Sequence, residues 1–225
     1  MVKIHKSGVV SNAEGMDKLR AEFEQSNCVC LPGLLDPELS SSVIRFMQHG
    51  IWKTYVEPGF YSEDDLEPGP ADDLLQFVVN WPRFIEVVQE ITGCGPFTWF
   101  QGRVYRLLPN SGHHDWWHTD FTDGRLVALS VILSPRGYQG GSFQMRKRLS
   151  ERLIADIAGL GPGDAILFRI SEELVHRVTE VRGQEPRTVF AGWFKNGEPS
   201  LWVRLQDRIN QTRLSSSGYS GTTGE

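Results

Sequence analysis

Cysteine is scarce in this chain of 225 residues, which contains three. Cys28 and Cys30 are separated by a single residue, so they lack the spacing of a zinc knuckle or of a redox motif, and Cys94 makes the number odd. We expect Cys28 and Cys30 to lie in a short buried strand as small apolar residues. This usage favours a reducing compartment.

Long hydrophobic runs are missing as well. No segment approaches the roughly 18 apolar residues of a membrane-spanning helix. The chain does not open with a charged region followed by an apolar one, as a signal peptide would. We therefore expect a cytoplasmic protein without a membrane partner.

An excess of positive charge is also absent. The net charge is −5 and the isoelectric point is about 5.7, which argues against a broad phosphate-binding surface and hence against a nucleic-acid partner. Aromatic residues, in contrast, are plentiful, with seven Trp and twelve Phe. They favour a β-rich fold that encloses a pocket.

Helical patterns dominate the first part of the chain. Asp36 has the character of an N-cap, because Pro37 follows it at the first helical position. The acidic stretch 56–71 is rich in Pro and Gly, and we interpret it as a long surface loop and a candidate lid. The expected helices are 16–25, 36–48, 72–79 and 81–92.

Strand patterns dominate from residue 97 onwards. Residues 126–133 form a nearly continuous apolar run, as in a strand that is buried on both faces. Residues 149–157 have apolar residues at helical spacing, and we expect a helix there. The other expected strands are 98–108, 142–145, 165–170, 187–194 and 201–205.

Helices followed by many short strands indicate an α+β protein, mainly β, whose β part is a two-sheet roll or barrel. We expect a single domain over residues 1–206. In it, residues 16–95 form helical support and residues 96–206 form the β-roll core. The low-complexity segment 207–225 is expected to be a disordered tail.

A metal-ligand pattern lies in Trp116-Trp117-His118-Thr119-Asp120. In an extended segment alternate side chains point the same way, so His118 and Asp120 can reach one metal ion. A second histidine, His176, lies far downstream. Two histidines and one carboxylate, with other coordination positions open, are the ligand set of non-haem Fe(II) oxygenases.

The sequence contains the same His-x-Asp pattern a second time, at His113 and Asp115. That copy follows Pro109-Asn110-Ser111-Gly112 and therefore belongs to a solvated loop, whereas His118 and Asp120 lie nearer the apolar strand. We predict that His118 and Asp120 are the ligands. His114 lies either in the exposed loop or, if the strand extends that far, beside His118 with a role toward the substrate.

Arg187 follows His176 by eleven residues and begins an alternating strand. If His176 faces the barrel interior, Arg187 on the next strand projects into the same cavity. A buried arginine needs an anion, and its planar guanidinium suits a carboxylate. A dicarboxylate that chelates the metal at one end would supply that anion at the other; the alternative is a surface salt bridge.

These motifs together resemble the 2-oxoglutarate/Fe(II)-dependent dioxygenases, and in detail the prolyl-4-hydroxylase-like branch. The resemblance covers residues 95–196 and the segment 32–47. The motifs are His118-Thr119-Asp120, Tyr138-Gln139-Gly140-Gly141-Ser142-Phe143, Gly161-Pro162-Gly163-Asp164-Ala165-Ile166-Leu167-Phe168, His176-Arg177-Val178-Thr179-Glu180-Val181, Gly183, Arg187 and Gly192-Trp193-Phe194.

The resemblance implies a double-stranded β-helix (jelly-roll or cupin-like) with Fe(II) held by His118, Asp120 and His176. It also implies 2-oxoglutarate salt-bridged to Arg187, O2 as the oxidant, and succinate and CO2 as co-products. Related halogenases have a small residue where Asp120 stands, so the carboxylate favours hydroxylation. The zinc hydrolase alternative leaves Arg187 unexplained.

The chain departs from the family before the metal motif. Many relatives carry Tyr-x-x-Gly there, and the matching Leu107-Leu108-Pro109-Asn110 has leucine in the tyrosine position. Tyr105 lies on the same face and is our candidate for binding the cosubstrate, although a core position is the alternative. The candidate substrate-pocket residues are Trp116, His114, Arg103 and Trp193.

Substrate identity is not fixed by these motifs. We expect hydroxylation of an unactivated C–H in a small molecule or amino acid, because no extended peptide groove is evident. A peptidyl-proline or other protein hydroxylase is one alternative. A non-catalytic cupin-like ligand-binding module is the other.

Overall fold

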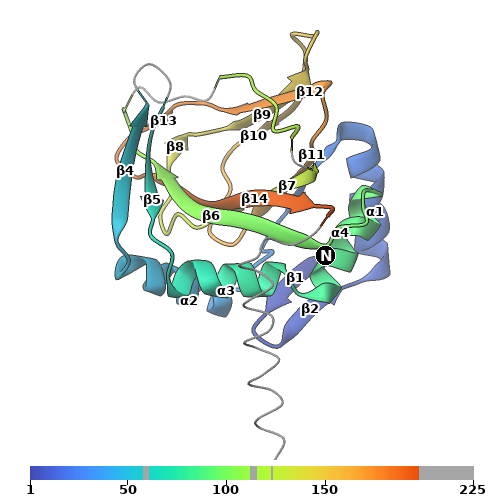
Figure 1. Ribbon diagram of the computed structural model, residues 1–225, viewed down its shortest axis with the longest axis horizontal. Coiled ribbons are helices and arrows are strands. Elements are labelled where there is room, and N and C mark those ends of the chain that lie inside the picture. The colour runs from blue at the N-terminus through green and yellow to red at the C-terminus, as the bar shows by residue number, and fades with distance from the viewer. Residues whose placement is uncertain (58–60, 112–115, 123, 198–225) are drawn as a thin grey trace, which may run out of the picture.

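A computed structural model describes residues 1–57, 61–111, 116–122 and 124–197. Four helices lie in the first half of the chain (Figure 1): α1 Ala13–Ser26, α2 Pro37–Gln48, α3 Pro70–Val79 and α4 Pro82–Thr92. Each expected helix of this region is present. The N–H of Leu39 donates to Asp36 Oδ1 at 2.8 Å, so Asp36 caps α2 as predicted.

Seven antiparallel strands form the larger sheet, in the order β3-β11-β7-β14-β6-β5-β4. Strands that are distant in sequence are neighbours in this order, which gives the crossing connections of a roll. The bounds are β3 Cys28–Leu31, β4 Trp52–Glu57, β5 Tyr61–Leu66, β6 Trp99–Leu107, β7 Arg125–Ile132, β11 Ala165–Arg169 and β14 Arg187–Lys195.

A smaller sheet faces the larger one (Figure 1) and has the order β10-β9-β12. Its strands are β9 Phe143–Lys147, β10 Leu153–Ile157 and β12 Leu174–Val178. Two short pairs complete the strands: β1 Val2–His5 with β2 Gly8–Ser11, and β8 Gln139–Gly140 with β13 Val181–Arg182. The two facing sheets form the expected double-stranded β-helix.

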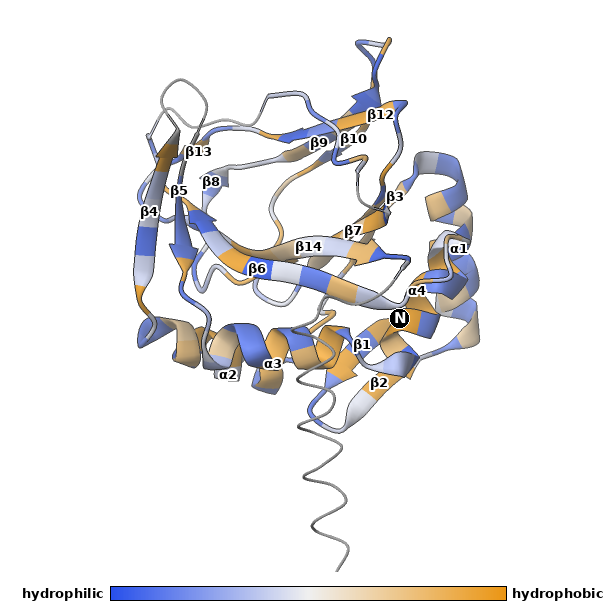
Figure 2. Cartoon of the chain, in the orientation of Figure 1, coloured by the Kyte–Doolittle hydropathy of each residue, from blue (hydrophilic) through white to orange (hydrophobic). Residues whose placement is uncertain are grey.

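The main core lies between the larger sheet and the helices. Hydrophobic and hydrophilic residues alternate along α3 and α4 (Figure 2), so one side of each helix packs inward. The rings of Phe100, Phe190 and Phe194 are fully buried there, with centroids 4.8 to 5.5 Å apart for the pairs that include Phe100. This packing leaves the opposite face of the larger sheet free to build a cavity.

Two expectations for individual elements were wrong. Residues 56–71 are not one long loop, because β4 and β5 pair as an antiparallel hairpin that extends the larger sheet. Residues 149–157 are not a helix, because β10 pairs with β9. A register shift between Leu153 and Ala155 interrupts the alternation of β10. As a result, the apolar residues of this strand have the spacing expected of a helix.

None of the described helices combines the length and the apolarity that a membrane span requires. Cys28 and Cys30 lie in β3, as expected. The strand expected at 201–205 and the tail 207–225 fall outside the described residues, and the division of the chain into one domain over 1–206 stays a prediction.

Candidate metal centre

The ligand candidates come from two segments that meet at one bridge. The backbone N–H of His118 donates to the carbonyl of His176 at 3.1 Å, and the N–H of His176 donates to the carbonyl of His118 at 2.9 Å. His176 lies in the middle of β12 on the smaller sheet. The bridge therefore anchors the segment that carries His118 and Asp120 to that sheet and fixes the two imidazoles side by side, with centroids 4.4 Å apart.

Asp120 completes the cluster. Its Oδ2 lies 3.5 Å from His176 Nε2, and its Oδ1 lies 4.0 Å from His118 Nε2. One ligand atom from each of the three residues lies within 4.8 Å of the others. Two imidazoles and one carboxylate at this spacing can bind a metal ion on one face and leave its other coordination positions open.

The tautomer of His118 follows from its neighbours. Its Nδ1 lies 2.7 Å from the carbonyl oxygen of Trp116. A carbonyl only accepts hydrogen bonds, so Nδ1 is the donor in this contact, and Nε2 is the nitrogen that faces Asp120 and is available to a metal. This arrangement is typical of metal-binding histidines.

Trp193 and Arg125 support Asp120 from the larger sheet. The indole N–H of Trp193 donates to Asp120 Oδ2 at 2.8 Å, and the Arg125 guanidinium stacks on the Trp193 ring, 3.7 Å from its centroid. Burial alone would raise the pKa of Asp120. The hydrogen bond and charge of His176, the Trp193 indole and His118 outweigh burial and lower that pKa to about 2. Asp120 is thus an anion at any physiological pH.

Arg187 is the most unusual side chain of the cavity. It is 2% exposed, yet its Nε and Nη1 find no hydrogen-bond partner in the described part of the chain. Gly141 has a φ of +60°, and a Cβ there would lie 2.7 Å from Arg187 Cδ. The Gly140-Gly141 turn thus provides the space that the arginine needs. A buried, incompletely bonded guanidinium implies a missing anion.

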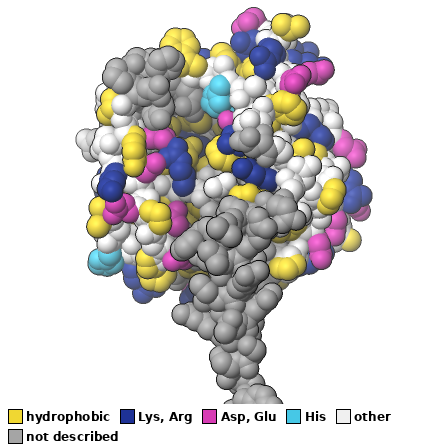
Figure 3. Space-filling view, in the orientation of Figure 1, with side chains coloured by type: hydrophobic (Ala, Val, Ile, Leu, Met, Phe, Trp, Pro, Cys, Tyr) yellow, Lys and Arg dark blue, Asp and Glu magenta, His cyan; other side chains and the backbone are white. Residues whose placement is uncertain are grey.

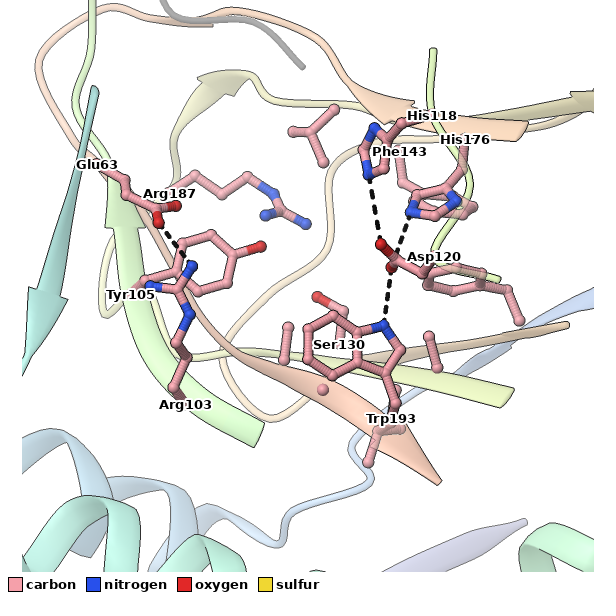
Figure 4. A pocket seen from close by; sticks show the side chains of 16 residues that line it. Glu63, Arg103, Tyr105, His118, Asp120, Ser130, Phe143, His176, Arg187 and Trp193 are labelled. Carbon is pink, nitrogen blue, oxygen red and sulfur yellow. Dashed lines mark hydrogen bonds and ion pairs between the residues drawn. The ribbon is translucent and has the colours of Figure 1, made fainter. Parts of the chain in front are cut away.

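One cavity of about 300 Å³ is lined by His118, Asp120, His176, Trp193 and Arg187. Figure 4 shows Arg187 on one side and His118, Asp120 and His176 on the other, with Tyr105 and Trp193 between and below them. Its remaining lining is mostly apolar, from Ala128, Leu129, Phe143, Phe168, Val178, Ala191 and Gly192, with Ser130, Glu63 and Arg103. In the surface view (Figure 3), a histidine lies above the centre of this face beside acidic and basic side chains.

The remaining sequence candidates have different placements. Tyr105, Arg103 and Trp193 line the cavity. Arg103 is held by Glu63 at 2.6 Å and by Asp65. Trp116 is 61% exposed and is not among the lining residues. His114, together with the rival pair His113 and Asp115, lies outside the described residues.

Sequence reasoning missed four residues around the metal centre and its cavity. Glu63 was hidden in the stretch that we interpreted as a loop. Arg125 begins an apolar strand, and only tertiary structure brings it to Asp120. Phe143 and Phe168 flank His176, with ring centroids 5.9 and 4.7 Å from it. For Phe143 the available signal was the alternation of buried and less buried residues along β9. Phe168 lies in the continuously buried run of β11, which carries no such signal.

Comparison with known proteins points to one family. Residues 100–195 match the sequence model of the 2OG-Fe(II) oxygenase superfamily, and this range includes all three ligand candidates and Arg187. The matched residues are similar to the 2OG-Fe(II) oxygenase superfamily, and they make up somewhat less than half of the chain. The match favours this oxygenase over a non-catalytic cupin-like module or a zinc hydrolase. No curated protein sequence matches the chain significantly.

Solved structures show the same fold at low identity. A Pseudomonas putida prolyl-4-hydroxylase has a TM-score of 0.62 and 18% identity, over 81% of this chain and 99% of that one. A Trichoplax adhaerens prolyl hydroxylase, in complex with a peptide fragment of hypoxia inducible factor, has 0.60 and 15%, over 83% and 94%. The epimerase SnoN, with Fe3+, alpha-ketoglutarate and nogalamycin RO, has 0.58 and 15%, over 82% and 85%.

The oxygenase is therefore a 2-oxoglutarate-dependent non-haem iron dioxygenase that uses Fe(II), 2-oxoglutarate and O2. The residues that line the cavity fit those cofactors. The His-Asp-His set has the donors that Fe(II) takes in such enzymes, and the incompletely bonded guanidinium of Arg187 suits a carboxylate.

Proposed function

We propose that this oxygenase hydroxylates an unactivated C–H of a small molecule or amino acid, with succinate and CO2 as co-products. His118, Asp120 and His176 hold the iron, and Arg187 binds the far carboxylate of 2-oxoglutarate. The observation that carries the proposal is the buried guanidinium of Arg187, short of acceptors, in the same cavity as the His-Asp-His cluster.

Each residue has a role that its surroundings support. The bound iron and cosubstrate supply the oxidising power, which the side chains alone do not have. Arg187 fixes the cosubstrate at the end away from the metal, and Tyr105 is placed to assist it from the neighbouring strand β6. The aromatic wall of Phe143, Phe168 and Trp193 excludes water from the reacting carbon.

Asp120 bears on the outcome of the reaction. A carboxylate at this position occupies a coordination site that a smaller residue would leave for a halide. Its low pKa keeps it anionic and ready to ligate. Hydroxylation therefore fits this site better than halogenation.

The size of the cavity favours a small substrate. About 300 Å³ must hold the cosubstrate and the reacting group together. A peptide substrate is the second candidate, because the Trichoplax adhaerens enzyme of the same fold was solved with a peptide fragment. SnoN, with nogalamycin RO, is an example of the same fold with a small molecule.

Arg187→Met provides the test of cosubstrate binding. Removing one partner of a buried charged pair costs about 2–5 kcal/mol, so the apparent KM for 2-oxoglutarate in CO2 release should rise about 30-fold or more. The control is Arg136→Met, which removes an exposed arginine paired with Glu185. An unchanged KM in Arg187→Met would contradict the assignment.

A second readout does not depend on turnover. With Mn(II) present, 2-oxoglutarate should raise the Tm of the wild type and of Arg136→Met, because a ligand stabilises the state that binds it. It should not raise the Tm of Arg187→Met. Without cosubstrate, Arg187→Met should be at least as stable as the wild type, because it removes a buried charge that lacks a partner.

A further inference from the structure

An irregularity in the larger sheet turns Arg125 to the face that carries Trp193. Ala128 pairs with Trp193 on the cavity face, so regular alternation would place Leu126 on that face and Arg125 on the other. A register shift between Phe194 and Lys195 instead pairs Arg125 with Lys195. Lys195 lies two positions after Trp193 and therefore on the same face of the sheet. Leu126 packs against the main core. Bulges that re-aim a side chain are common beside active sites.

The guanidinium of Arg125 is fixed in place yet incompletely bonded. Its side chain is 19% exposed and stacks on the ring of Trp193. Its Nε is buried and finds no hydrogen-bond partner within the described ranges. The nearest carboxylate oxygen, Asp120 Oδ1, lies 4.0 Å away, which is beyond hydrogen-bond distance. Stacking thus holds the cation while its buried Nε–H still lacks an acceptor.

Asp120 does not supply the missing acceptor for Arg125. Its Oδ2 accepts the indole N–H of Trp193, and as a metal ligand it shares its charge with a dication. The far carboxylate of the cosubstrate does not supply the acceptor either, because Arg187 binds it on the other side of the cavity (Figure 4).

We propose that Arg125 binds a carboxylate of the substrate and holds the reacting carbon beside Asp120, so that the substrate is a small carboxylic acid, amino acids included. This inference rests on the proposed function and narrows its substrate class. The planar guanidinium on Trp193 presents paired N–H donors that match a carboxylate. The two incompletely bonded arginines then bind two different anions: Arg187 binds the cosubstrate, and Arg125, beside Asp120, binds the substrate.

The test compares acids with their amides. Enzyme with Fe(II) and saturating 2-oxoglutarate, kept anaerobic, is titrated with acetate, butyrate, L-valine and L-leucine, and with the primary amide of each. The readout is the visible charge-transfer band of the iron–cosubstrate complex. Acids of suitable size should change the band saturably in the wild type, and amides should not. Arg125→Gln should weaken that binding at least tenfold, whereas Arg136→Gln should leave it unchanged.

Outcomes separate this inference from the proposed function. If the wild type forms no charge-transfer band, the proposed function itself fails. If the band forms but no acid changes it, if amides bind as well as acids, or if Arg125→Gln binds acids like the wild type, the role of Arg125 is overturned. Arg125→Gln is titrated at Fe(II) and 2-oxoglutarate concentrations at which its own band is complete, because Arg125 stacks on Trp193, which holds Asp120. An amidated peptide without acidic side chains that changes the band in both proteins would also overturn the role and favour a peptide substrate.

Discussion

Asp120 is the residue on which the neighbouring side chains of the metal centre converge. Its two oxygens have different surroundings, because Trp193 and His176 contact Oδ2, whereas Oδ1 faces His118 and Arg125. The indole N–H therefore restricts how the carboxylate can rotate. We infer that Trp193 is a positioning residue, which acts on the metal through Asp120.

Trp193→Phe tests this positioning. The change removes the N–H donor and keeps an aromatic ring beneath Arg125. Losing a partner that orients a metal ligand typically lowers metal affinity about 10–100-fold, and we expect a loss of this size for Mn(II) in a titration followed by electron paramagnetic resonance. Trp52→Phe is the control, since Trp52 stacks on Arg106 away from the cavity. An affinity within twofold of the wild type would refute the role of Trp193.

The hairpin of β4 and β5 shows why an element can be impossible to predict from the local sequence. The segment Glu63-Asp64-Asp65 is acidic enough to indicate a solvated loop. In the fold, however, Arg103 binds Glu63 and Asp65 on the cavity face, and Arg106 binds Asp64 on the opposite face. Neutralisation by a neighbouring strand, which no local pattern reveals, allows an acidic segment to be a strand.

Arg106→Met should destabilise this hairpin. Asp64 is buried and accepts from Arg106 Nε and Nη2 at 2.9 and 2.8 Å and from the Thr54 hydroxyl at 2.6 Å. Breaking a buried pair costs about 3–5 kcal/mol, and because Arg106 is partly exposed we expect a loss of about 1–3 kcal/mol in urea unfolding.

The matched control for that change is Arg182→Met, which removes the exposed pair with Glu180. It should alter stability by less than about 0.5 kcal/mol. Adding Asp64→Asn to Arg106→Met should recover part of the loss, because the buried charge is removed with its partner. Equal stabilities of Arg106→Met and Arg182→Met would show that the hairpin does not depend on this ion pair.

Strand β14 shows the opposite case, in which alternation alone was enough. Arg187, Val189, Ala191 and Trp193 were predicted to share a face, and three of these four residues line the cavity. The face was predictable because a regular strand places alternate residues together. Arg125 was not predictable in this way, because a register shift in the pairing of β7 with β14, where Leu126 has no partner, decides its direction.

For the whole molecule, the sequence predicted the double-stranded β-helix and the convergence of His118, Asp120, His176 and Arg187. Motifs separated by many residues made this possible, since each is needed for the same cavity. The sequence did not predict which neighbours support that cavity. The hydrogen bond between Trp193 and Asp120 and the ion pair between Arg103 and Glu63 depend on how distant strands pair. The whole chain specifies that pairing.

The central claim is that His118, Asp120 and His176 bind Fe(II) next to 2-oxoglutarate held by Arg187. Anaerobic addition of Fe(II) and 2-oxoglutarate tests it most directly, with the visible metal-to-ligand charge-transfer band as the readout. We predict the band in the wild type and in His113→Ala, and its loss in His118→Ala. No band in the wild type, or a band that survives in His118→Ala but is lost in His113→Ala, would contradict the account.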